Sequence, residues 1–439
     1  MGVQQCEVVV IGGGPAGSTA AALLAEAGRQ VVLLEKDVHP RFHIGESLLP
    51  ANMPLLDRLG VRDEVDAIGM PKLGVEFVSP QHEHVVDLRF IDAWDKSLSG
   101  ALQVRRSDFD HLLLRNAGRK GARVLEGHRV RQVEFHPAFG GATVQATGPD
   151  GRSSSWDARL VIDASGRDTF LGNTFRIKQK YPGHSSAAVF GHFRGARRHD
   201  GSREGDITIF WFQHGWFWFI PLADGTTSVG AVCWPYYLKS RSKPLPEFLA
   251  DTIAMCPRLA SRLEGATRVD DVHATGNYSY SCTTAHGADR QARCLMAGDA
   301  FAFIDPVFSS GVFLAMSSAF MAVEAAQSCL DRPGRSAAAM RAYERRIRKA
   351  PAEFAWFIER MTQPAMRELF MHPRNVLRAR EAVMSILAGD IYRGTPYKPS
   401  LLAFKSFYYM NLMRTPLATI RSWRTRKHNI RDVSLAADA

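Results

Sequence analysis

The sequence predicts a mixed α/β fold, in which a domain with a parallel sheet is interleaved with an antiparallel-sheet domain and followed by a helical region. A strand, a glycine-rich turn, a helix and a second strand occupy the first 35 residues. Short apolar strands of the same kind recur at residues 159–163 and 294–297. Aromatic and β-branched segments lie between them and are typical of antiparallel strands. With 439 residues, the chain is also too long for one ordinary domain.

The N-terminal unit has the pattern of a dinucleotide-binding βαβ unit. The first strand, residues 8–11, runs into the turn Gly12-Gly13-Gly14-Pro15-Ala16-Gly17, and the following helix stops at Gly28. Three glycines in such a turn allow a tight bend, a close approach of the backbone to a pyrophosphate and close packing of helix on strand. Free N–H groups at the helix N-terminus suit the phosphates. Glu35, at the end of the second strand, can bind both hydroxyls of an adenosine ribose.

The domain boundaries follow from where these patterns stop and resume. We expect residues 1–70, 101–170 and 286–335 to form the discontinuous cofactor domain, and residues 71–100 and 171–285 to form the β-sheet substrate domain. Residues 336–439 are expected to be helical, with six prolines as breakers: Pro351, Pro364, Pro373, Pro396, Pro399 and Pro416.

The composition excludes several classes of protein. Apolar residues make up 46% and charged residues 23%, as in soluble globular proteins. The net charge of +11 is spread along the chain, so it does not indicate a nucleic-acid partner. The six cysteines form no C-x-x-C pair, which disfavours a disulfide scaffold and a zinc site, and no metal site is predicted. No apolar run reaches the ~18–20 residues of a membrane span, and there is no leader motif. We therefore expect a soluble cytoplasmic protein.

Segments beyond the glycine turn identify the dinucleotide. Arg106 begins the segment Arg-Ser-Asp-Phe-Asp, and Asp299 follows a glycine at the end of a late strand. With the glycine turn they resemble the flavoproteins that bind FAD in an extended form, of the glutathione-reductase type and similar to para-hydroxybenzoate hydroxylase. The resemblance implies a pyrophosphate at the glycine turn, Arg106 beside it and Asp299 on the ribityl chain. The implied FAD-binding residues are Gly12, Gly14, Ala16, Gly17, Glu35, Lys36, Arg41, Ser47, Arg106 and Asp299. A second glycine fingerprint for a nicotinamide cofactor is absent.

The segment from Gly215 to Pro221, Gly-Trp-Phe-Trp-Phe-Ile-Pro, indicates what the flavin is used for. Trp216 and Trp218 point to one face of a strand because side chains alternate. By itself the segment is also typical of an aromatic core strand. Beside the FAD residues, however, it resembles the W-x-W-x-I-P motif of the flavin-dependent halogenases, which comprises Trp216, Trp218, Ile220 and Pro221. The resemblance implies that this motif keeps organic substrate away from the flavin.

That family implies a specific chemistry. Reduced FAD from a separate flavin reductase, O2 and chloride or bromide give hypohalous acid, which travels through the protein to a lysine near an electron-rich ring. Lys72 lies in the stretch that corresponds to the family's lysine, so the resemblance implies that Lys72 is the catalytic residue. The alternative interpretation is an ordinary surface lysine after a proline turn. Ser310 and Gly311 open a long helix and are the expected halide site, with a serine helix cap as the alternative.

The chain departs from the tryptophan halogenases at Phe308, where those proteins carry a glutamate. This departure and the short C-terminal part resemble the phenol- and pyrrole-type halogenases. A phenolic or pyrrolic substrate is therefore expected, either free or tethered to a carrier protein. A C-terminal basic cluster suits an acidic carrier, an anionic membrane surface or plain solvation, and comprises Arg414, Arg421, Arg424, Arg426, Lys427 and Arg431. Alternative functions within the fold are an aromatic hydroxylase and an isoprenoid double-bond reductase, and a non-catalytic flavin-binding protein is a third.

Overall fold

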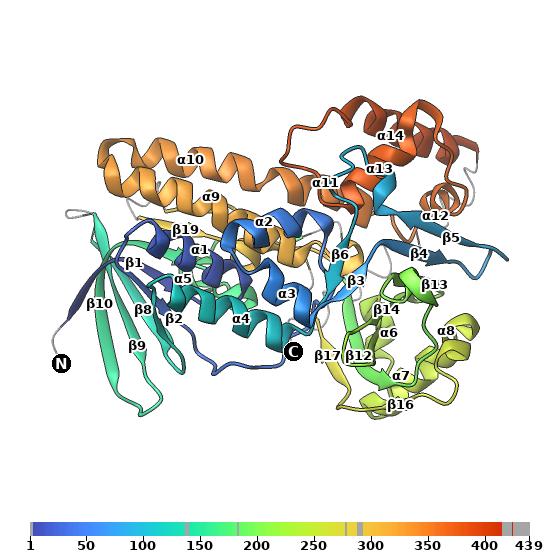
Figure 1. Cartoon of the computed structure of the whole chain (residues 1–439), viewed down its shortest axis with the longest axis horizontal. Helices are drawn as coiled ribbons and strands as arrows, with labels where there is room; N and C mark the ends of the chain where they lie inside the picture. The colour runs from blue at the N-terminus through green and yellow to red at the C-terminus, as the bar shows by residue number, and fades with distance from the viewer. Residues whose placement is uncertain are drawn as a thin grey trace.

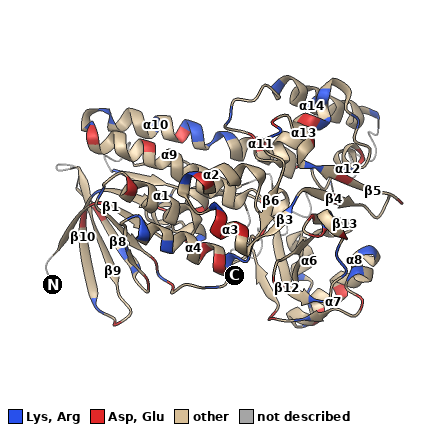
Figure 2. Ribbon diagram, in the orientation of Figure 1, with Lys and Arg blue, Asp and Glu red and all other residues tan. Residues whose placement is uncertain are grey.

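The computed structural model describes residues 3–136, 140–181, 184–276, 279–287, 293–414 and 424. Two large sheets stand side by side, with helices α9 and α10 above the first sheet and the C-terminal helices beside the second (Figure 1). Basic and acidic residues are interspersed over most elements rather than gathered in one stripe (Figure 2). Of the predicted C-terminal basic cluster, Arg414 and Arg424 are described and exposed. Arg421, Arg426, Lys427 and Arg431 lie outside the described residues.

The first sheet has the strand order β7-β2-β1-β10-β9-β8, with β19 also paired to β10. The strands β7, β2, β1, β10 and β19 run parallel, whereas β9 pairs in antiparallel fashion with both β10 and β8. Their bounds are β1 Gln4–Ile11, β2 Val31–Leu34, β7 Arg123–Leu125, β8 Arg129–His136, β9 Gly141–Thr147, β10 Ser153–Asp163 and β19 Cys294–Met296. The β-branched strands are buried on both faces, as parallel strands between helices are.

Several helices cover this sheet and share its apolar core. Helix α1 packs against α4 and α9, and α10 packs against α9. Their bounds are α1 Pro15–Glu26, α4 Arg106–Arg119, α9 Gly311–Asp331 and α10 Ser336–Ile347. Helix α9 is long and apolar enough to cross a membrane, but 72% of its apolar window is buried inside the protein. It is therefore a core helix, which explains its composition. All six cysteines are buried and free.

The second sheet has the order β16-β12-β15-β14-β13-β4-β5, with β17 paired to β12. The bounds are β4 Gly74–Val78, β5 Val85–Arg89, β12 Ala187–Arg194, β13 Ile207–Phe212, β14 Gly215–Pro221, β15 Thr226–Cys233, β16 Thr267–Arg268 and β17 His273–Thr275. The sheet was expected to be antiparallel throughout, but β13 pairs with β4 in parallel. The two strands are far apart in sequence, so no hairpin dictates their direction.

Helices cover both faces of the second sheet. Helices α7 (Leu245–Ala254) and α8 (Pro257–Arg262) pack on the face that carries Phe217 and Phe219. The face with Trp216 and Trp218 shares its core with the C-terminal helices. Those helices are α11 Lys349–Ile358, α12 Pro364–Met371, α13 Ala379–Leu387 and α14 Lys398–Arg414.

Shorter elements join the two parts. The ribbon of β3 (Met70–Lys72) and β6 (Ala101–Gln103) lies between the sheets (Figure 1). A three-stranded sheet consists of β11 (Lys178–Lys180), β18 (Tyr280–Cys282) and β20 (Ala302–Phe303). The remaining helices are α2 Met53–Leu59, α3 Arg62–Ile68, α5 Phe170–Thr174 and α6 Pro235–Lys239.

Candidate active site

The glycine turn joins β1 to α1, and the surroundings of its glycines differ. Gly12 has a φ of +100°, and a Cβ there would lie 2.4 Å from the carbonyl oxygen of Ala164. A Cβ on Gly17 would lie 1.9 Å from the carbonyl oxygen of Gly12, so α1 can approach β1 this closely only with glycine. On Gly14 a Cβ would meet only the Arg41 guanidinium at 3.9 Å. The turn is thus closed on the protein side and open beside Gly14.

Beside Gly14 lies a cavity of about 730 Å³ that extends from the glycine turn to the second sheet. Most of the site residues expected from the sequence line this one cavity: Gly12, Gly14, Ala16, Glu35, Lys36, Arg41, Ser47, Arg106, Trp216, Trp218, Ile220, Asp299 and Gly311. Four expected residues do not line it: Gly17, Lys72, Pro221 and Ser310. The fold therefore joins most of the expected FAD-binding residues and the tryptophan pair in a single space.

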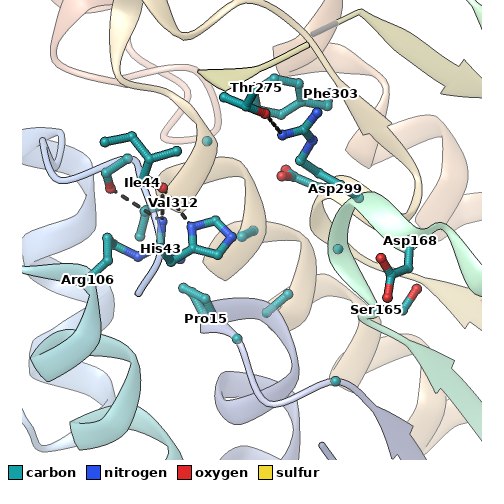
Figure 3. A pocket seen from close by; sticks show the side chains of 18 of the residues that line it. Pro15, His43, Ile44, Arg106, Ser165, Asp168, Thr275, Asp299, Phe303 and Val312 are labelled. Atoms are coloured by element: carbon teal, nitrogen blue, oxygen red, sulfur yellow. Dashed lines mark hydrogen bonds between the residues drawn. The ribbon is translucent and has the colours of Figure 1, made fainter. Parts of the chain in front are cut away.

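Arg106 and Asp299 lie on opposite sides of this cavity (Figure 3). Arg106 donates to Asp110 through Nε at 2.8 Å and to the Ile44 carbonyl through Nη1 at 3.0 Å. The guanidinium therefore holds the loop at Ile44 against α4. Burial alone would raise the pKa of Asp110, but Arg106 holds it below its ordinary value.

The surroundings of the Asp299 and Glu35 carboxyl groups indicate whether the cavity fits FAD. Burial raises the pKa of Asp299 to about 6, against the opposing charges of Arg106 and Arg167. None of the described residues donates a hydrogen bond to the Asp299 carboxyl, which lines the cavity, so it is available to a ligand hydroxyl. Glu35 accepts hydrogen bonds from the Gly13 amide at 2.5 Å and the Asp37 amide at 2.8 Å, which fix its carboxylate. Together with the open side at Gly14, these groups fit FAD.

Lys72, at the end of β3, is 2% exposed. Its Nζ donates to the Ser47 hydroxyl at 2.9 Å and to the Leu48 carbonyl at 3.1 Å. The nitrogen also lies 5.2 Å from the ring centre of Phe90. Burial lowers the pKa of Lys72 to about 7, and the charge of Asp206 opposes this only in part. Lys72 is therefore not a surface lysine. It is separated from the cavity wall by one hydrogen bond, to Ser47.

The tryptophan pair forms part of the cavity wall on β14. The ring centres of Trp216 and Trp218 are 6.1 Å apart, and the Trp218 indole donates to the Ser228 hydroxyl at 3.0 Å. Gly230 on β15 makes room for the Trp218 ring, because a Cβ there would lie 2.2 Å from it. Since Phe217 and Phe219 fill the opposite face, every residue of the motif is buried.

The turn before α9 is held by Asp305. Its carboxylate accepts hydrogen bonds from the Val307 amide at 3.2 Å and from His184 at 2.9 Å. Ser309 then adopts a left-handed conformation, with φ +55°, and α9 begins after Ser310. Gly311 lines the cavity, whereas the Ser310 side chain neither lines it nor caps the helix. The alternative interpretation, in which the Ser310 hydroxyl caps the helix, is therefore wrong.

Phe308 belongs to the apolar core shared with the C-terminal helices. It is 4% exposed and its ring centre lies 5.9 Å from that of Phe357 on α11. The position at which tryptophan halogenases carry a glutamate therefore faces packed aromatic side chains here.

A buried chain of charged groups, which the sequence did not predict, leads to the cavity. His192 contacts Glu46 through Nε2 at 2.8 Å and Asp270 through Nδ1 at 2.5 Å. Both ring nitrogens face carboxylates, so both carry protons; although burial lowers the pKa of His192, the two acids raise it overall. Glu46 lines the cavity with Oε2 unpaired, and the Asp270 side chain is 29% exposed. The chain thus connects the surface with the cavity wall.

Comparison with known proteins agrees with this arrangement. A family model described as an FAD binding domain matches residues 5–353. The 1H-pyrrole-2-carbonyl-(peptidyl-carrier protein) chlorinase of Pseudomonas fluorescens is 30% identical over 413 residues, which cover 88% of this chain and 90% of that protein. The tryptophan 2-halogenase of Chondromyces crocatus is 35% identical over 345 residues, which cover 77% of this chain and 64% of that protein.

A solved structure, that of the myxobacterial chondrochloren halogenase, matches 95% of this chain and 97% of its own with 31% identity and a TM-score of 0.77. The chain spans 64–65% of the length of the first three curated relatives that it matches.

Proposed function

This chain belongs to the flavin-dependent halogenases, and from that premise we propose that it halogenates an electron-rich aromatic group. Reduced FAD, O2 and chloride or bromide would give hypohalous acid within the cavity. We propose that a separate flavin reductase supplies the reduced FAD and that the protein works in the cytoplasm. The buried amine of Lys72, one hydrogen bond behind the cavity wall, is the single observation that carries the proposal.

We propose that the residues of the glycine turn, with Ala16, Glu35, Lys36, Arg41, Ser47, Arg106 and Asp299, hold FAD. Bound and reduced, the flavin would supply the two electrons that activate O2. Gly311 and the neighbouring backbone would hold the halide at the N-terminus of α9, where the helix dipole favours an anion. Trp216, Trp218 and Ile220 would exclude organic substrate from this end of the cavity, with Pro221 ending the motif.

Lys72 is the proposed catalytic residue. With a pKa of about 7, much of the amine is neutral at neutral pH and has a lone pair for an oxidised halogen. Ser47 lines the cavity and binds Lys72, so it would mark the passage from one to the other. The Glu46–His192–Asp270 chain would exchange protons between the cavity and the surface.

A phenolic or pyrrolic substrate, free or tethered to a carrier protein, is the proposed class. Phe308 supports it because its surroundings are apolar, whereas the carboxylate of the tryptophan halogenases would need polar partners. The P. fluorescens relative, whose name specifies a carrier-bound pyrrole, matches over 90% of its own length.

We also propose the three-part domain division that the sequence predicts, with α10 packed onto the cofactor part.

The test is mass spectrometry of phenols, pyrroles and tryptophan, both free and carrier-tethered, after incubation with a flavin reductase, NADH, FAD and each halide. The proposal expects a product with the chlorine or bromine isotope pattern that disappears without halide or reductase. A product that gains oxygen but no halogen would assign an aromatic hydroxylase. Anaerobic saturation of an isoprenoid double bond would assign a reductase. Flavin binding without any product would assign a non-catalytic protein.

A further inference from the structure

We propose that His82, Glu368 and His372 form a binding site for a divalent transition metal, with Zn²⁺ as the expected ion. None of the three lines the cavity described above, and this inference does not depend on the proposed function. His82 lies in the turn between β4 and β5, Glu368 lies on α12, and His372 directly follows the last residue of that helix. The structure places these two segments beside each other (Figure 1).

The spacing of the three side chains suits a metal ion. Glu368 Oε2 lies 3.2 Å from Nε2 of His82, and Glu368 Oε1 lies 3.2 Å from Nε2 of His372. One ligand atom from each residue lies within 4.8 Å of the others. Tetrahedral Zn²⁺ with bonds of about 2.0–2.2 Å needs ligand atoms roughly 3.3–3.6 Å apart. Small rotations of these side chains therefore bring the three atoms around one ion.

The hydrogen bonds behind His82 determine which of its ring nitrogens carries the proton. Arg367 donates to the side-chain oxygen of Gln81, because a guanidinium has only donors. The Ser79 hydroxyl donates to the same oxygen at 3.2 Å. With its only proton used there, the Ser79 oxygen must accept from Nδ1 of His82, at 2.9 Å. A neutral His82 therefore carries its proton on Nδ1 and has a lone pair on Nε2.

This lone pair faces a carboxylate oxygen of Glu368 at 3.2 Å, and neither atom has a proton to donate. Only a cation can make this contact favourable: either a metal ion between the two atoms or a proton on Nε2. The hydrogen bond from His82 to Ser79 also suits a metal ion at Nε2, because a histidine that binds a metal usually donates its other ring N–H to a neighbouring acceptor. The contact is thus a place where a cation would be stabilised, and the spacing of all three ligand atoms is the observation that points to a metal.

The site is open to solvent on one side and fixed on the other. The side chains of Glu368 and His372 are about half exposed, whereas that of His82 is 13% exposed. His84 holds the same turn to the end of α12, because its Nε2 donates to the Met371 carbonyl at 2.8 Å. Solvent water could therefore complete the coordination. A bound ion would link the β4–β5 turn to the C-terminal helical layer.

The test is calorimetric titration of the untagged, chelator-treated full chain with Zn²⁺, with Co²⁺ as a spectroscopic probe. We expect one equivalent to bind and the visible absorption of tetrahedral Co²⁺ to appear. His82→Ala and His372→Ala should each remove saturable binding, and Ser79→Ala should weaken it by roughly tenfold. His136→Ala is the matched control: this imidazole contacts Thr143 at 2.8 Å on another hairpin, and its loss should leave binding unchanged.

Glu368→Gln keeps the test independent of folding defects. The amide can donate to Nε2 of His82, so the metal-free variant should stay folded while the rise in melting temperature caused by Zn²⁺ disappears. Absence of saturable binding by the wild type through the micromolar range would overturn the proposal. Zinc binding that survives in His82→Ala would overturn it as well, because the ion would then bind elsewhere.

Discussion

Replacing Lys72 by Met tests whether a buried amine with a lowered pKa lies behind the cavity wall. Methionine keeps much of the volume of the chain but has no titratable group. It also removes the hydrogen bonds from Nζ to Ser47 and to the Leu48 carbonyl. That loss has nearly the same effect at every pH, so the variation of stability with pH isolates the titration of the amine.

The magnitude follows from the two pKa values of Lys72. Its pKa is about 7 in the folded protein and 10.5 ordinarily, so between these values the unfolded chain binds a proton that the folded chain does not. The free energy of unfolding therefore rises with pH at about 1.4 kcal/mol per pH unit across this window. From pH 10.5 down to pH 7 the wild type loses about 5 kcal/mol in total, and below pH 7 the contribution stays constant.

The assay is urea denaturation of the wild type and of Lys72→Met at several pH values between 7 and 9. The difference in unfolding free energy should change by about 2 kcal/mol over these two pH units, because the amine is half titrated at pH 7, with the wild type gaining as the pH rises. Lys398→Met is the control, because Lys398 is exposed at the start of α14, and its profile should parallel that of the wild type. Parallel profiles for Lys72→Met and the wild type would refute a lowered pKa for Lys72.

Three further substitutions test other parts of the account. Gly14→Val should keep the circular dichroism of the fold but lose bound FAD, because its side chain enters the open side of the glycine turn; unchanged flavin absorbance would contradict this. Gly230→Ala should destabilise the protein by about 1–3 kcal/mol, since its Cβ would lie 2.2 Å from the Trp218 ring, and an unchanged melting temperature would disprove the clash. Asp270→Asn should lower the pKa of His192 in an NMR titration, because one of the two carboxylates that raise it is lost, and an unshifted titration would rule out the ion pair.

Short-range patterns made much of the fold predictable. The glycine turn, its strands and helix α1 lie within 35 residues, so their spacing alone predicted the unit that the structure contains. The parallel pairing of β13 with β4 was not predictable in this way. It depends on a contact between segments far apart in sequence, and the alternation of side chains within a strand does not reveal the direction of its neighbour.

The same distinction between local patterns and contacts of distant segments applies to the site. Trp216 and Trp218 share one strand face, which two-residue alternation predicts. Glu46, His192 and Asp270 come from three distant segments, and no local motif predicts that one imidazole bridges the two acids. The absence of a metal site was predicted from cysteine spacing alone. That reasoning could not detect a cluster of two histidines and a glutamate built from a hairpin turn and a distant helix.

The role of Lys72 is tested most directly by comparing Lys72→Met with the wild type in a reaction with flavin reductase, FAD, O2 and halide. Two quantities are measured together: the halogenated aromatic product, and the hypohalous acid trapped in solution by a small scavenger. We predict that the variant reoxidises flavin at the wild-type rate and releases trapped hypohalous acid but forms no aromatic product. Equal product formation by the variant and the wild type would contradict the account.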